Sequence, residues 1–162
     1  MENTIFSNIS ILRISDKTRD GALQQLADHM IAAGYARPGY DEAVISRENA
    51  YPTGLHTNGV EIAIPHADAE WTLLPALAIG LLEQPVVFQP MGGQGSEVQA
   101  SLIFMLTLSD PSAHIDFLRA FSKIIEDEEV MNQYQQTRDI QLLLNRLRLE
   151  YSAASTPIRP SV

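Results

Sequence analysis

The chain has 162 residues, 45% of them hydrophobic, and a formal net charge of −9. A chain of this length suits one domain that can bury a core without disulfides or a structural metal. It contains no cysteine, which excludes disulfide scaffolds, thiol nucleophiles and cysteine-ligated zinc. The excess of acidic residues argues against nucleic acid as a partner, because phosphate backbones select basic surfaces.

The sequence shows no pattern of a membrane-spanning helix and no export signal in its first residues. No stretch approaches the roughly 18 apolar residues that a spanning helix needs, and the first ten residues lack the regions of a signal peptide. Together with the absence of cysteine, this predicts a cytoplasmic protein without membrane insertion. Residues 151–162 include two prolines and no hydrophobic period, so we expect a disordered tail after a domain of residues 1–150.

The first half of the chain predicts two helices, a loop and a strand. Apolar residues at helical spacing predict a helix over 18–33 and a shorter one over 40–47. Residues 50–59 contain Pro-Thr-Gly and Asn-Gly, which are typical of a loop. Residues 60–64 read as a strand that ends at Pro65, because proline cannot donate to a strand ladder.

The second half predicts strands followed by helices. Residues 76–82 form a strand-length apolar run, 86–88 a short edge strand, and 100–108 a central strand buried on both faces. A helix begins at Pro111, and amphipathic patterns continue to residue 149. The fold class is therefore α/β: a single three-layer domain with a mixed sheet of about five strands flanked by helices.

Only four histidines are available for chemistry. His66 follows a predicted strand and a proline, at a strand end where α/β proteins place their sites. His114 lies in the first turn of a predicted helix, where free N–H groups favour anions. Spacing alone is also typical of an ordinary loop histidine and an ordinary first-turn residue. We interpret His29 as a surface or helix-packing residue and His56 as a loop histidine.

Further candidates carry charge or glycine. Arg47 offers a planar cationic fork that suits phosphoryl oxygens, although an arginine at a helix end can also simply offset the helix dipole. The run Gly92-Gly93-Gln94-Gly95 lacks the Lys-Ser/Thr of a P-loop, so it reads as a flexible loop. No histidine–carboxylate set has the spacing of a metal site.

Two stretches of sequence resemble one family. Residues 47–55, Arg-Glu-Asn-Ala-Tyr-Pro-Thr-Gly-Leu, and 59–66, Gly-Val-Glu-Ile-Ala-Ile-Pro-His, resemble enzyme IIA domains of the mannitol/fructose class of sugar phosphotransferase systems. The resemblance extends over roughly residues 5–148. Many family members have Gly after the histidine, whereas this chain has Ala67-Asp68. That form, with Val-Val-Phe-Gln at 86–89, is closer to the galactitol-type branch.

The resemblance implies a function. His66 would accept a phosphoryl group from the histidine-containing phosphocarrier protein and pass it to a separate enzyme IIB, for galactitol or a related polyol. Arg47 would lie near the phosphoryl group, and His114 would match the family's second histidine. No metal or cofactor is needed, since the donor is itself a phosphohistidine. We also expect exposed apolar residues around His66, with Leu55 and Trp71 as candidates; Trp71 can equally be a packing aromatic.

Two alternatives stay open at the level of sequence. In the first, His66 is phosphorylated but the chain is a regulator whose output is binding to another protein. In the second, the Ile-Pro-His sequence is a coincidence within a non-catalytic α/β binding domain, and substitution of His66 has no consequence.

Overall fold

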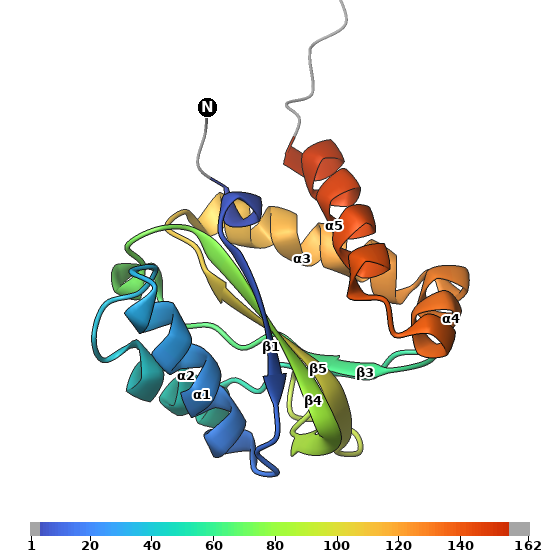
Figure 1. The fold of residues 1–162 in the computed structure, drawn as a ribbon, viewed down its shortest axis with the longest axis horizontal. Coiled ribbons are helices and arrows are strands. Elements are labelled where there is room, and N and C mark those ends of the chain that lie inside the picture. Colours follow the sequence, from blue (N-terminus) through green and yellow to red (C-terminus); the bar gives the residue numbers. More distant parts are fainter. Residues whose placement is uncertain (1–3, 156–162) are drawn as a thin grey trace, which may run out of the picture. The chain divides into compact units, whose positions relative to one another are not determined.

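A five-stranded mixed sheet forms the centre of residues 4–109 (Figure 1). The computed structural model describes residues 4–155. Across the sheet the strands are β1 (Ile9–Ile14), β4 (Ala76–Phe88), β5 (Val98–Thr107), β3 (Glu61–Ala63) and β2 (Gly54–Leu55). The β1–β4 and β3–β5 pairs are parallel, and the β4–β5 and β2–β3 pairs are antiparallel. This confirms the predicted α/β class and the mixed sheet of about five strands.

The two long strands at the centre of the sheet are β4 and β5. Residues 102–107 of β5 are all buried, as the apolar run predicted. The prediction of two separate strands over 76–88 was wrong, because β4 is continuous and its pairing register shifts between Leu81 and Val86. Pro85 lies in this irregular, exposed stretch, where its missing N–H leaves no ladder bond unmade.

Strands β1 and β2 were not predicted. Ile11 in the middle of β1 is 41% exposed, so the strand does not show a simple alternation of buried and exposed side chains. Strand β2 has two residues, which is too short for any periodic pattern. Both elements therefore exist because a neighbouring strand pairs with them, which sequence periodicity does not register.

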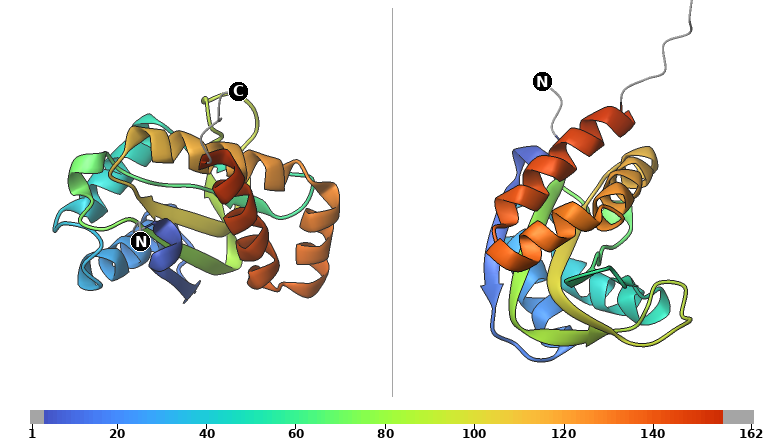
Figure 2. Two further views of the ribbon diagram at one scale, coloured as in Figure 1. Left: turned by 90° about the horizontal axis from the view of Figure 1, so that it is seen from above. Right: turned by 90° about the vertical axis from the view of Figure 1, so that its right-hand side faces the viewer.

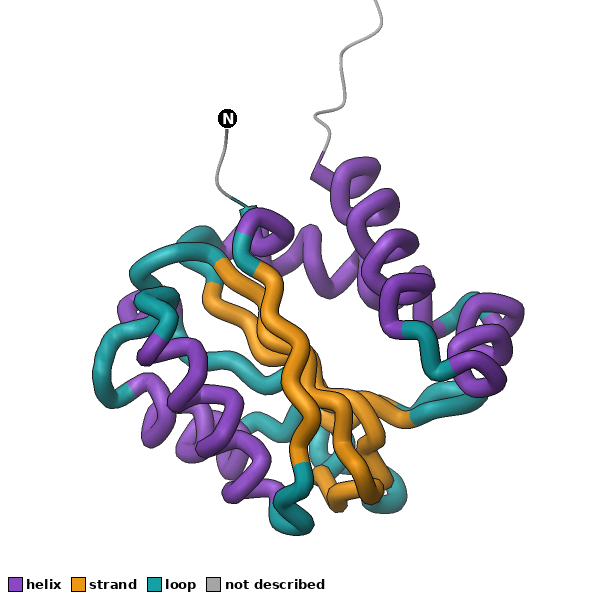
Figure 3. Tube along the Cα trace, in the orientation of Figure 1, coloured by secondary structure: helices purple, strands orange, loops and turns teal. Residues whose placement is uncertain are grey.

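Two helices of this unit pack side by side (Figures 1 and 3). They are α1 (Arg19–Ala32) and α2 (Tyr40–Ala50). The side chain of Thr18 caps α1 by accepting from the N–H of Gly21. Helix α2 continues about one turn beyond the predicted end at Arg47. Two short 3-10 turns, η1 (Ile5–Ser7) and η2 (Ala69–Trp71), complete the elements of this unit.

Residues 110–155 form a second compact unit of three helices (Figure 2). These are α3 (Pro111–Ile125), α4 (Glu128–Thr137) and α5 (Ile140–Ser155), and α3 packs against α5. The Asp110 side chain caps α3 by accepting from the N–H of Ser112. Helix α5 continues to Ser155, so the first residues of the predicted tail, 151–155, are helical. The rest of that tail, 156–162, lies outside the described residues, and the domain boundary at 150 stays a prediction.

Membrane-spanning helices are absent from the described part of the chain. Among residues 4–155, no helix combines the length and the apolar character that a bilayer crossing requires.

Candidate active site

The segment that carries His66 continues from the end of β3. After Ala63 the ladder stops, but the carbonyl of Pro65 accepts from the N–H of Leu106 at 3.3 Å, and His66 bridges to the same residue of β5. The hydroxyl of Tyr40 donates to the carbonyl of Leu106 at 2.6 Å. Because both contacts end on Leu106, the start of α2 and the His66 segment are tied to one point of the central sheet.

The imidazole of His66 is half-buried and held by its own backbone. Its Nδ1 lies 3.0 Å from the carbonyl oxygen of Ile64. A carbonyl oxygen can only accept, so Nδ1 carries the proton in this arrangement. In the neutral ring the lone pair is then on Nε2, which makes Nε2 the nucleophilic nitrogen.

A buried pair supports this segment from the α2 side. The carboxylate of Glu48, 2% exposed, accepts from the backbone N–H of Thr53 at 2.8 Å and from its hydroxyl at 2.8 Å. The hydroxyl oxygen of Thr53 in turn accepts from the N–H of Ile64 at 3.2 Å. Burial raises the pKa of Glu48, while the bonds from Thr53 and the charge of Arg19 oppose that rise.

Arg47 on α2 brings a positive charge to the site. Its Nη1 donates to the carboxylate of Asp68 at 2.8 Å, and its guanidinium lies 5.4 Å from the centre of the Tyr51 ring. Its Nε is buried and makes no hydrogen bond within the part of the chain that the structure describes. A buried N–H without an acceptor is costly, and an incoming phosphoryl oxygen would supply that acceptor.

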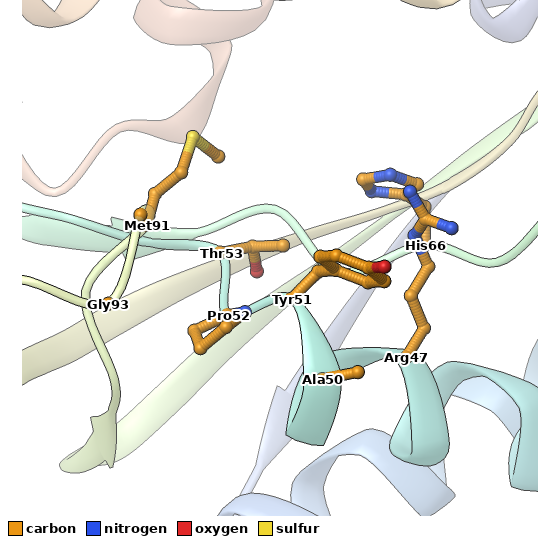
Figure 4. A pocket seen from close by; sticks show the side chains of 9 residues that line it. Arg47, Ala50, Tyr51, Pro52, Thr53, His66, Met91 and Gly93 are labelled. Carbon is orange, nitrogen blue, oxygen red and sulfur yellow. The ribbon is translucent and has the colours of Figure 1, made fainter.

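His66 and Arg47 line one cavity of about 380 Å³ (Figure 4). Figure 4 shows the Arg47 side chain extending from α2 toward the imidazole, with Tyr51 beside it. Tyr51 is 67% exposed and Met91 is 44% exposed, so apolar surface adjoins the two polar groups. The other lining residues are Ala50, Pro52, Thr53, Gly92 and Gly93. The structure thus brings together two of the three predicted site residues.

The far wall of this cavity belongs to the glycine-rich loop, residues 91–96. Its first residue is fixed by the N–H of Met91, which donates to the carbonyl of Gly54 at 2.8 Å. Near its end, Nε2 of His56 lies 2.8 Å from the carbonyl oxygen of Ser96, and Nδ1 of His56 pairs with the carboxylate of Glu61. These hydrogen bonds, first that to Ser96 and then that to Glu61, raise the pKa of His56.

The other predicted residues have different outcomes. His114 lies in the first turns of α3, in the second compact unit. Its role stays a prediction. His29 is half-buried, with Nε2 at 2.8 Å from the hydroxyl of Ser10, and has no part in the cavity. Trp71 is half-buried and packs against the core, which favours the packing interpretation. Leu55 is also half-buried, and the exposed apolar residues that line the cavity are Tyr51 and Met91.

Sequence reasoning assigned no role to Glu48, Thr53 or the glycine-rich loop. The first two lie inside the stretch of family resemblance, which was the available signal. The glycine run marks the loop but does not place it near His66, because its approach to the cavity depends on where β4 and β5 turn. Within residues 4–155, no group of three or more potential ligands lies close enough together to hold a metal ion.

Comparison with known proteins identifies this arrangement. Residues 4–149 match the family model described as phosphoenolpyruvate-dependent sugar phosphotransferase system, EIIA 2. The chain belongs to this family. It is therefore a phosphotransferase component of the sugar phosphotransferase system, as the resemblance implied. The Ile-Pro-His motif is thus part of a family match and not a coincidence in an unrelated binding domain.

Individual relatives agree with the family. The fructose-specific EIIABC component of Bacillus subtilis is 29% identical over 126 residues, which are 75% of this chain but only 19% of that protein. The galactitol-specific EIIA component of Escherichia coli K12 is 26% identical over 118 residues, 73% of this chain and 78% of its own length.

A solved structure shows the same fold. One chain of the complex of enzyme IIAMTL and phosphorylated enzyme IIBMTL from Escherichia coli has a TM-score of 0.67, with 22% identity over 87% of this chain and 94% of its own.

Proposed function

We propose that this chain is a cytoplasmic phosphoryl carrier that accepts phosphate on Nε2 of His66 and passes it to an enzyme IIB. The observation that supports it is the pairing of Nδ1 with the Ile64 carbonyl, in a histidine that shares a cavity with Arg47. The hydrogen bond to Ile64 leaves the lone pair on Nε2, and Arg47 supplies a cation for the phosphoryl oxygens. The family membership of the chain supports the same reaction.

Transfer onto His66 exchanges one nitrogen–phosphorus bond for another. The lone pair of Nε2 attacks the phosphorus of a partner's phosphohistidine, and the bond from phosphorus to the partner's nitrogen breaks with its electron pair returning to that ring. Because Nδ1 keeps its proton, the phosphorylated ring of His66 carries a positive charge, which the Ile64 carbonyl stabilises. The reaction is an in-line displacement, so its rate depends mostly on positioning and charge.

Arg47 contributes charge and hydrogen bonds in this scheme. Its Nε–H, buried and without an acceptor among the described residues, would donate to an equatorial phosphoryl oxygen. Preorganised donors of this kind stabilise developing charge without reorganisation. His114 is retained as the second histidine that the resemblance implies, at the N-terminal end of α3.

Transfer away from His66 reverses the first step. A nucleophile of enzyme IIB, a cysteine in this class, attacks phosphorus, and His66 leaves as a neutral imidazole because Nδ1 is still protonated. The chain has no cysteine, so the IIB group is supplied from outside this sequence. The complex of enzyme IIAMTL with phosphorylated enzyme IIBMTL, a structural neighbour, supports IIB as the recipient.

The finer assignments are the donor and the sugar. We propose the histidine-containing phosphocarrier protein as the donor, and galactitol or a related polyol as the sugar of the whole system, in line with the galactitol-specific relative. The cavity beside His66 is the site for a phosphoryl group in transit between proteins, and the sugar itself plays no part in this step.

The test is intact-mass spectrometry at neutral or alkaline pH after incubation with phosphoenolpyruvate, enzyme I and the phosphocarrier protein. We expect one acid-labile phosphoryl group on the wild type and none on His66→Ala. A galactitol-type IIB added next should remove that group; retention of it would favour the regulatory alternative. No added mass on the wild type, while a known IIA in the same mixture is labelled, would refute the carrier.

A further inference from the structure

We propose that Glu48 is a positioning residue for His66, acting through the Thr53 hydroxyl and the backbone of Ile64 to hold the Nδ1–H form of the imidazole. The inference rests on the proposed function, since it concerns which ring nitrogen of His66 carries the lone pair that attacks phosphorus. Glu48 belongs to α2, and nothing in the transfer chemistry itself requires a carboxylate there.

Burial makes Glu48 unusual. Three polar or charged side chains are buried among the residues that the structure describes, and two of them, Glu48 and Thr53, bond to each other; the third is Thr107. A buried acid costs free energy unless its oxygens are fully hydrogen-bonded. The partners of Glu48 are the N–H and the hydroxyl of Thr53, so its retention in the core is tied to the geometry of that one residue.

The direction of each hydrogen bond is fixed by chemistry. A carboxylate can only accept, so the single proton of the Thr53 hydroxyl points at Glu48. The hydroxyl oxygen is then left with lone pairs, and it accepts from the N–H of Ile64 at 3.2 Å. The carbonyl of Ile64 accepts from Nδ1 of His66 at 3.0 Å. The carboxylate therefore sets the donor–acceptor direction of a series of hydrogen bonds that runs through Thr53 and Ile64 to the imidazole of His66.

These hydrogen bonds support the backbone just beyond the end of strand β3. Strand β3 ends at Ala63, and only one backbone bond continues its pairing with β2 at Ile64. The acceptor of that bond, the carbonyl oxygen of Thr53, is 3.4 Å from the N–H of Ile64, near the limit of a useful bond. Without the hydroxyl, the N–H of Ile64 keeps only this longer bond, so we expect the carbonyl of Ile64 to be aimed less closely at Nδ1 of His66. A free imidazole favours the opposite tautomer, with the proton on Nε2, which has no lone pair for phosphorus.

The experiment compares the matched variants Thr53→Val and Thr53→Ser with Glu48→Gln in the full chain. Nitrogen-15 NMR of the imidazole measures the His66 tautomer in the absence of any partner, and mass spectrometry measures the rate of phosphorylation. We expect wild type and Thr53→Ser to hold the Nδ1–H form. We expect Thr53→Val to populate Nε2–H and to be phosphorylated at least about tenfold more slowly, since small displacements of a reacting group are costly.

Glu48→Gln keeps the shape of the side chain and addresses the polarity directly. Its amide nitrogen would donate to the Thr53 hydroxyl oxygen where Oε2 accepted at 2.8 Å, which leaves the hydroxyl proton only the longer 3.1 Å contact to Oε1. We expect a shift of the His66 tautomer in the same direction as in Thr53→Val. This variant also serves if Thr53→Val does not fold.

Two results would overturn the proposal. One is an unchanged Nδ1–H population in both Thr53→Val and Glu48→Gln, even with lowered thermal stability, because a purely structural role predicts that outcome. The other is a tautomer shift in Thr53→Ser equal to that in Thr53→Val. Failure of the proposed carrier function would look different: the wild type would show the Nδ1–H form and still take up no phosphate.

Discussion

Two walls of the same cavity are supported in opposite ways. On the α2 side, the His66 segment is held by Glu48 and Thr53, which are both buried. On the other side, the loop 91–96 is held by His56, which is exposed, through the Ser96 carbonyl. Each support uses a titratable side chain that bonds two groups at once. They differ in how much solvent competes for those bonds.

That difference suits the two tasks of a carrier. A bond in a low-dielectric interior is strong and costly to leave unmade, so it fixes a reacting group. A bond in water breaks at little cost, so the segment it holds can adapt when one docked protein replaces another. The buried wall carries the nucleophile, and the exposed wall carries glycines and Met91.

The largest expected effect is on the rate of phosphoryl transfer to His66 when Arg47, on the α2 side of the cavity, is replaced. Arg47→Ala should slow phosphorylation of His66 by about 100-fold, as for loss of a preorganised donor, with little change in thermal stability. Arg47→Lys keeps the charge but loses the fork and should be intermediate. Rapid-quench mass spectrometry gives the rates. An Arg47→Ala rate within twofold of wild type would remove Arg47 from the reaction.

The second prediction compares the two supports through stability. Glu48→Ala leaves the N–H and hydroxyl of Thr53 without their acceptor in the interior, which should cost about 2–3 kcal/mol in the free energy of unfolding. His56→Ala removes as many hydrogen bonds at the surface and should cost much less. Urea unfolding measures both. Equal losses in the two variants would abolish the distinction between a fixed wall and an adaptable one.

Glycine substitutions extend the comparison to the backbone. A Cβ on Gly54 would lie 2.6 Å from the carbonyl oxygen of Gln89, so Gly54→Ala should cost about 2 kcal/mol through overpacking. Gly93 has a φ of +74° and open space around it, so Gly93→Ala should cost about 1 kcal/mol, from backbone strain alone. Thermal unfolding of the pair is the measurement. A larger loss in Gly93→Ala would mean that the loop is held as tightly as its base.

The smallest expected effect is a dependence on pH at His56. Bonds to Ser96 and Glu61 raise its pKa above the ordinary value of 6.5, and only the protonated ring can donate from both nitrogens. Its stabilisation is therefore complete below the unfolded-state pKa and is lost as pH rises through the higher folded-state pKa.

Amide hydrogen exchange in the loop 91–96 measures this dependence. After correction for the intrinsic effect of pH, protection should fall across that window in the wild type. His56→Gln, which does not titrate, is the control and should show no such change. Identical profiles for the two proteins would show that His56 does not hold the loop.

Different parts of the site were predictable to different degrees. Helices α1 and α2 and strands β3 and β5 follow hydrophobic periodicity, and Pro65 marks the end of β3, so His66 could be placed at a strand end. The pairing that creates β1 was invisible, because Ile11 is exposed and no period results. The union of two predicted strands into β4 was missed because Pro85 interrupts the pattern, whereas the strand continues through the register shift between Leu81 and Val86.

The sequence by itself determined the family, the acceptor candidate His66 and the cationic candidate Arg47. These follow from residue types in local order, which a linear reading contains. Tertiary structure alone decided which nitrogen of His66 faces a carbonyl, which side chain pairs with the buried Glu48 and which loop closes the cavity. The physical reason is that hydrogen-bond partners are chosen in space: Ile64 bonds to a threonine 11 positions earlier, and Met91 lines the same cavity as His66 only because two strands turn back.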